Sequence, residues 1–145
     1  LYTMYAEEGN EYVVCLNAGD GEQLWRVKTG EYYQEKQGGD GPRSTPAVDG
    51  EAVYVLSAQG TLHALAADTG ASIWQKSLVE EFASKVPRWG FSTSPLVEGD
   101  LLFVEVGGVR GNIVVNMVIK REAGATVAAI DKKPDARPGL PSRTR

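Results

Sequence analysis

The chain has 145 residues, and its 42% hydrophobic and 23% charged residues are typical of one globular domain rather than of a disordered or fibrous protein. The net charge of −4 gives no general reason to expect nucleic-acid binding, and no apolar run is long enough to span a membrane. The single cysteine, Cys15, excludes a disulfide within the chain, and the 17 glycines predict many tight turns.

The first predicted elements are three short strands at residues 1–5, 12–17 and 23–27, where β-branched and aromatic residues gather between turn signals. We interpret Cys15 as a small buried hydrophobic residue of the middle strand. A second group has four strands, expected at residues 44–48, 52–57, 61–66 and 72–76 and separated by glycine turns. His63 alternates with apolar neighbours there, and we interpret it as a packed or edge residue rather than a ligand.

A third group begins with strands at residues 93–97 and 101–106. Its third strand is expected late, at residues 125–130, because Ala129-Ile130 aligns with Ala64-Leu65 at an offset of 65 residues. This alignment places an insertion near residues 109–124. In the connection before this group, Ser77 and Glu80 have capping-box spacing, which predicts a short helix within residues 77–85.

An internal repeat of 49 residues relates these groups. Trp74 follows Trp25 by 49 residues, and Gly70 follows Gly21 by the same interval. Four strands per 40–50 residues are typical of a β-propeller blade. We therefore predict an all-β fold of about three four-stranded antiparallel blades, some of them incomplete, from a larger propeller. Because blades fan out from an axis, tryptophans on outer strands are expected to fill the gaps between blades.

The stretch ALAADTGASIW at residues 64–74 resembles the repeat of the PQQ-like (pyrroloquinoline-quinone-type) β-propellers, whose pattern is roughly A-x-D-x-x-T-G-x-x-x-W. The resemblance covers about residues 1–133, with blade units at about 1–28, 42–77 and 91–133. Asn17 and Ala66 depart from the pattern, which has Asp at both positions. The residues that match the structural repeat motif are Gly21, Trp25, Thr69, Gly70, Trp74 and Asp131.

The family includes quinoprotein dehydrogenases, a propeller lipoprotein of bacterial outer-membrane assembly, and many secreted proteins. The resemblance therefore implies a periplasmic or secreted bacterial protein. Its dehydrogenases hold PQQ with a vicinal cysteine pair and calcium, but this chain has one cysteine and no spacing typical of a calcium loop. No catalytic set or metal site is evident. We favour a non-catalytic binding or protein-interaction scaffold; the alternative is part of a PQQ-dependent alcohol or sugar dehydrogenase, with calcium.

One face of the predicted blades carries long connections, at about residues 28–43 and 77–91, whereas the turns at the opposite face are tight. We call these the long-loop face and the tight-turn face. Long loops on a rigid scaffold commonly bind ligands, so we expect the rest of the propeller, another protein, a peptide or a small ligand as partner. For Arg88 and Trp89 we favour packing of the loop itself, and contact with a ligand or peptide is the alternative. The candidate residues are Tyr32, Tyr33, Arg43, Arg88 and Trp89.

The last residues break the repeat. After Asp131 the pattern requires T-G-x-x-x-W, but the chain continues KKPDARPGL. Loss of one base from the codons AAG-AAG-ACC-GGA would convert K-K-T-G into K-K-P-D, so we interpret residues 134–145 as a frameshifted end. The alternative is an authentic tail rich in proline and arginine; both interpretations predict disorder. Self-association of three blades into a closed ring is a further alternative to membership in a longer propeller.

Overall fold

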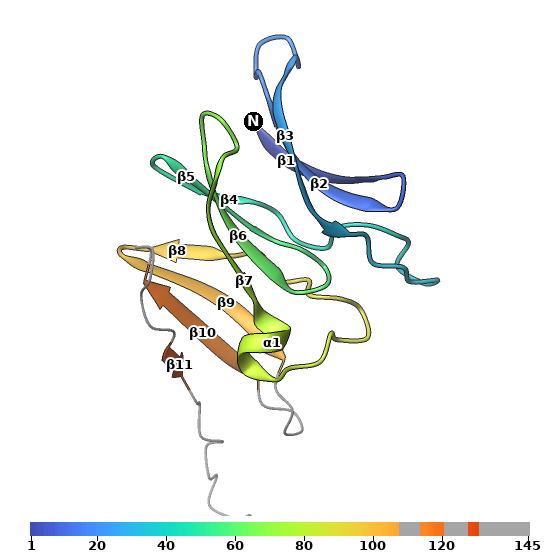
Figure 1. Ribbon diagram of the computed structural model, residues 1–145, viewed down its shortest axis with the longest axis vertical. Coiled ribbons are helices and arrows are strands. Elements are labelled where there is room, and N and C mark those ends of the chain that lie inside the picture. The colour runs from blue at the N-terminus through green and yellow to red at the C-terminus, as the bar shows by residue number, and fades with distance from the viewer. Residues whose placement is uncertain (108–113, 121–127, 131–145) are drawn as a thin grey trace, which may run out of the picture.

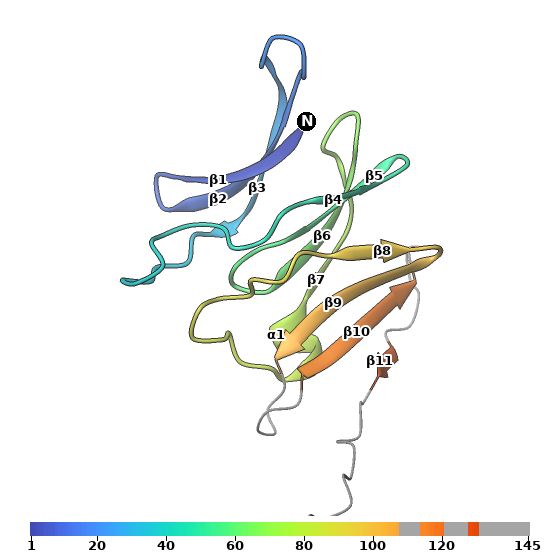
Figure 2. The ribbon, with the colours of Figure 1, turned by 180° about the vertical axis from the view of Figure 1, so that it is seen from behind.

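The computed structural model describes residues 1–107, 114–120 and 128–130, and Asp131 and the predicted tail lie outside this range. Its strands form three antiparallel sheets, which lie side by side in chain order (Figures 1 and 2). The first sheet has the order β1-β2-β3. Its strands are β1 (Tyr2–Glu7), β2 (Asn10–Leu16) and β3 (Gln23–Glu31), close to the three predicted ones.

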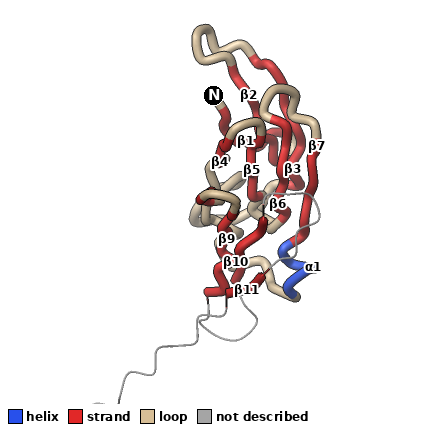
Figure 3. The backbone as a smooth tube through the Cα atoms, turned by 90° about the vertical axis from the view of Figure 1, so that its left-hand side faces the viewer, coloured by secondary structure: helices blue, strands red, loops and turns tan. Residues whose placement is uncertain are grey.

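The second sheet has the order β4-β5-β6-β7, and β4 and β7 lie at its opposite sides in Figure 3. The strands are β4 (Ala47–Asp49), β5 (Ala52–Leu56), β6 (Thr61–Ala66) and β7 (Ser72–Ser77). The prediction of four strands is confirmed, but β4 begins three residues later than expected. Pro46 directly precedes it, and proline has no N–H to donate to a sheet.

The third sheet has the order β11-β10-β9-β8. Its strands are β8 (Leu96–Glu98), β9 (Leu101–Gly107), β10 (Val114–Lys120) and β11 (Ala128–Ile130). Because β10 pairs with β9, it occupies the third position, and β11 is the outer strand. A strand therefore does lie within the predicted range 125–130, but its predicted position as the third strand was wrong, because residues 114–120 of the predicted insertion form the third strand. The β-branched run in β10 is a stronger strand signal than the short Ala-Ile match.

The predicted helix is α1 (Leu78–Phe82), which follows β7 directly. Ser77 is its N-cap, and the side-chain oxygen of Ser77 accepts a hydrogen bond of 3.2 Å from the amide of Glu80. Ala83 ends the helix in the left-handed region, at φ +47°. Leu78 is fully buried in the core between the second and third sheets, so packing holds this short helix in place.

The second sheet is buried on both faces. Val53 and Val55 of β5 pack against the first sheet, whereas Tyr54 and Leu56 of the same strand pack against the third. Successive side chains of a strand point to opposite faces, so two cores require an uninterrupted apolar run. This requirement explains why the sequence of β5, AVYVL, does not alternate with polar residues.

Trp25 of β3 fills the space between the first two sheets. Its indole Nε1 donates a hydrogen bond of 3.0 Å to the carbonyl of Ala67, and its ring lies against Gly70. A Cβ on Gly70 would lie 2.8 Å from Trp25 Cε3, and the backbone there has φ +72°. The aromatic packing recurs, because the Tyr2–Trp25 ring centroids are 5.7 Å apart and the Tyr54–Trp74 centroids 6.1 Å apart.

We predict that Gly70→Ala lowers the free energy of unfolding of the 145-residue chain more than Gly21→Ala does. Both positions have φ above +70°, but no described atom lies within 4 Å of a Cβ at Gly21. Both variants therefore introduce backbone strain, and only Gly70→Ala displaces Trp25, at an additional cost of about 1–3 kcal/mol. Denaturant unfolding measures the difference. Equal losses of unfolding free energy in the two variants would show that the packing of Trp25 does not depend on the absence of a Cβ at position 70.

Candidate functional site

The two long connections are tied to each other. Residues 32–46 join the first sheet to the second, and residues 83–95 join α1 to β8. The hydroxyl of Tyr33 donates a hydrogen bond of 2.9 Å to the carbonyl of Arg88, and the amide of Thr45 donates one of 2.8 Å to the side chain of Ser94. Two segments that are far apart in sequence therefore support one another on the long-loop face.

Arg88 and Trp89 form the exposed part of this contact. The guanidinium carbon of Arg88 lies 5.2 Å from the centroid of the Trp89 ring, within the range of a cation–π interaction. Trp89 is 44% exposed, although a large aromatic side chain gains stability when it is buried. The pair therefore offers both an apolar surface and a positive charge to a partner.

The other two candidate residues lie elsewhere on the same connection. The hydroxyl of Tyr32 accepts a hydrogen bond of 2.6 Å from Gln34, and its ring packs beside Gly9 at the β1–β2 turn. The guanidinium of Arg43 donates hydrogen bonds to the carbonyls of Gly38 and Gly39. The structure thus brings together Tyr33, Arg88 and Trp89, whereas Tyr32 lies against the β1–β2 turn and Arg43 bonds to the backbone of its own connection.

Two buried titratable side chains lie between the first two sheets, and neither was predicted as functional. Glu11 is fully buried, and burial raises the pKa of its carboxyl group. His63 is nearly buried, and burial lowers the pKa of its imidazole. The strand period contained a signal for Glu11, because it alternates in phase with Val13 and Cys15, which are buried on the same strand.

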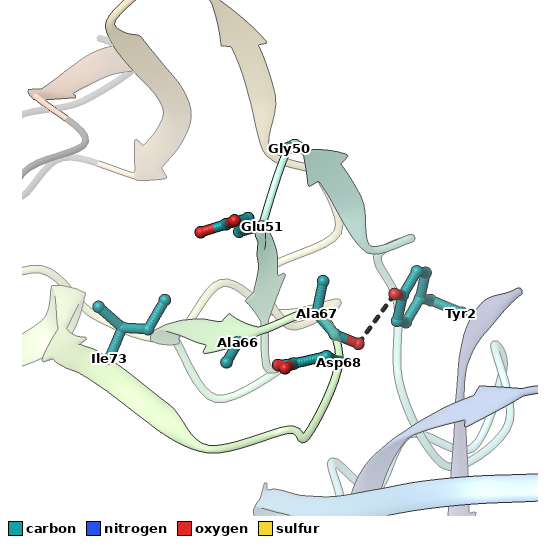
Figure 4. Close-up of a pocket in the computed structure, with 7 residues that line it drawn as sticks. All are labelled: Tyr2, Gly50, Glu51, Ala66, Ala67, Asp68 and Ile73. Carbon is teal, nitrogen blue, oxygen red and sulfur yellow. Dashed lines mark hydrogen bonds between the residues drawn. The ribbon is translucent and has the colours of Figure 1, made fainter.

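A pocket of about 550 Å³ lies at the tight-turn face, where no binding residue was predicted (Figure 4). Tyr2 comes from the first sheet, and its hydroxyl donates a hydrogen bond of 3.0 Å to the carbonyl of Ala67. Glu51 and Asp68 contribute exposed carboxylates, which suit a cationic group. The lining residues are Tyr2, Gly50, Glu51, Ala66, Ala67, Asp68 and Ile73.

Among the described residues, no three histidine, cysteine or acidic side chains gather in a way that could hold a metal ion. Cys15 is buried in the core between the first two sheets, and it has no second cysteine to pair with. Across the same residues, no helix is long and apolar enough to cross a membrane.

We predict that Tyr33→Phe loosens the connection at residues 83–95, because it removes the hydroxyl that holds the Arg88 carbonyl. Loss of one such hydrogen bond costs about 1 kcal/mol. Amide hydrogen exchange of residues 86–91 should therefore become about fivefold faster. Tyr32→Phe is the matched control, since that hydroxyl contacts only Gln34 among the described residues. Equal exchange rates in the two variants would contradict the proposed tie.

Comparisons with known proteins bear on the fold. The model of a family described as outer membrane protein assembly factor BamB matches residues 9–134. A comparison with curated proteins gives no significant match. Similar solved structures include a europium-containing methanol dehydrogenase, with 18% identity and a TM-score of 0.59 over 88% of this chain and 22% of that chain.

Two further structures are similar. The quinohemoprotein alcohol dehydrogenase from Comamonas testosteroni has 20% identity and a TM-score of 0.59, over 88% of this chain and 20% of that chain. BamB from Moraxella catarrhalis has 16% identity and a TM-score of 0.51, over 81% of this chain and 36% of that chain. The chain thus spans about a fifth of each dehydrogenase and about a third of BamB, and at these identities the likeness concerns the fold.

Proposed function

The chain belongs to the PQQ-like β-propeller repeat family, and from this premise we propose that it is a non-catalytic scaffold that binds other proteins. The fold prediction is confirmed: the chain is a set of antiparallel blades that corresponds to part of a larger propeller. The same fold occurs in dehydrogenases and in an assembly factor, so the site must carry the functional argument.

The observation that supports a scaffold is that hydrogen bonds hold the two long connections together, next to the exposed Trp89. A binding surface gains affinity when its loops are ordered before the partner arrives, because less conformational entropy is then lost. Tyr33 provides this order by fixing the backbone of Arg88, next to Trp89. Tryptophan and arginine are also the residue types that most often dominate the energy of protein interfaces.

The remaining parts of the proposal follow from the family. We place the protein in the periplasm or outside a bacterial cell, and its partners are the rest of the propeller and other proteins. A peptide or small ligand on the long-loop face is compatible with the same surface. The second candidate is part of a quinoprotein dehydrogenase, which is favoured by the higher TM-scores of the two dehydrogenases. Its PQQ and calcium ligands would come from outside the described residues.

We predict that Trp89→Ala weakens partner binding by roughly 30-fold, which corresponds to a hot-spot loss of about 2 kcal/mol. The experiment compares proteins captured from envelope extracts by the full-length wild type and variant, followed by affinity measurement with each captured partner. Lys85→Ala is the control, because Lys85 is exposed on the same connection. Unchanged binding by Trp89→Ala would remove this surface from the proposal. Stoichiometric, calcium-dependent binding of PQQ to the full-length protein would favour the dehydrogenase instead.

A further inference from the structure

The interface between the first two sheets is called the joint below. Two buried titratable side chains cross it in opposite directions. Glu11 of β2 reaches the β5–β6 turn of the second sheet, where its Oε2 accepts a hydrogen bond of 3.1 Å from the amide of Ala58. His63 of β6 reaches the first sheet, where its Nε2 lies 2.9 Å from the carbonyl of Thr29. Because a carbonyl only accepts, this nitrogen carries the proton and donates. Each sheet thus supplies one titratable side chain and one backbone partner.

The surroundings of Glu11 disfavour its charge overall. The side chain is 0% exposed, and its Oε1 has no hydrogen-bond partner among the described residues. The amides of Ala58 and Tyr33 and the positive charge of Arg43 favour the carboxylate, but desolvation is the larger effect and raises the pKa of Glu11. Gly30, its strand partner on β3, adds no charge.

The surroundings of His63 disfavour its charge as well. The ring is 6% exposed, and its strand partners, Val55 on β5 and Gln75 on β7, are uncharged. The carbonyl of Thr29 favours the imidazolium, but desolvation is larger and lowers the pKa of His63. The neutral form of Glu11 is the protonated one, whereas the neutral form of His63 is the deprotonated one. Burial therefore shifts the pKa values of the two groups in opposite directions.

These shifts give stability contributions with opposite pH dependence. The raised pKa of Glu11 contributes stability that is complete below the ordinary value of 4.5 and is lost as the pH rises through the folded value. The lowered pKa of His63 contributes stability that is complete above 6.5 and is lost as the pH falls through the folded value. Between the two ordinary values, acidification therefore strengthens one contribution and weakens the other.

We propose that Glu11 and His63 form a compensating pair, in which each group offsets part of the other's effect on the stability of the joint between the first two sheets when its surroundings become mildly acidic. The reciprocal geometry suits this role, because the two groups act on the same pair of sheets. Either group alone would make the joint sensitive to pH in this range.

The test measures the unfolding equilibrium constant of the full chain between pH 4.5 and 6.5 in the wild type, Glu11→Gln and His63→Gln. Gln at position 11 keeps an acceptor for Ala58, and Gln at position 63 keeps a donor for Thr29. We expect the stability of the wild type to change less with pH than that of either variant. Glu11→Gln should lose stability as the pH falls and His63→Gln should gain it, each by up to about tenfold per pH unit. The exposed Glu22→Gln should follow the wild type.

Slopes of the same sign in the two variants, or profiles parallel to that of the wild type, would overturn the proposal. If either variant fails to fold, NMR titration of the wild type provides the second measurement. Pair compensation requires a folded pKa above 4.5 for Glu11 and below 6.5 for His63. Ordinary values for either group would overturn the proposal as well.

Discussion

The packing of the Trp25 indole on Gly70 is the contact on which the arrangement of the first two sheets depends. A ring of this size fits only because position 70 has no Cβ. The indole packs with side chains of β2 and β5 in one buried core, which includes Val13 and Val53. The other face of the second sheet is also buried, and there a separate core joins it to the third sheet.

This packing also explains where polar groups are found. The apolar cores lie between the sheets, so the turns and connections lie at the ends of the strands. The backbone N–H and C=O groups of these segments are outside the sheets and need other hydrogen-bond partners. In one connection, the hydroxyl of Tyr33 donates to the carbonyl of Arg88. In the β5–β6 turn, the amide of Ala58 donates to the carboxyl group of Glu11, which belongs to β2. The proposed binding surface and the proposed compensating pair therefore both include polar groups that lie beside the apolar core and hydrogen-bond to the backbone.

The sequence predicts the strands of the first two sheets well, because glycine turns and β-branched residues are local signals. It misplaces the third strand of the last sheet, because the prediction followed the short Ala-Ile match rather than the apolar run that forms β10. Glu11 could have been found from its phase with Val13, but the Tyr33–Arg88 contact could not. That contact depends on how two loops from different blades approach one another, which no periodicity encodes. The frameshift interpretation and Asp131 lie outside the described residues and stay predictions.

The carbonyl of Ala67 accepts two hydrogen bonds, one from the indole of Trp25 and one from the hydroxyl of Tyr2. The two donors stand on different strands of the first sheet, β3 and β1, so they hold a single point of the second sheet from two directions. A hinge movement between the sheets would lengthen at least one of these bonds. The angle between the first two blades is therefore set locally, by contacts at their own junction.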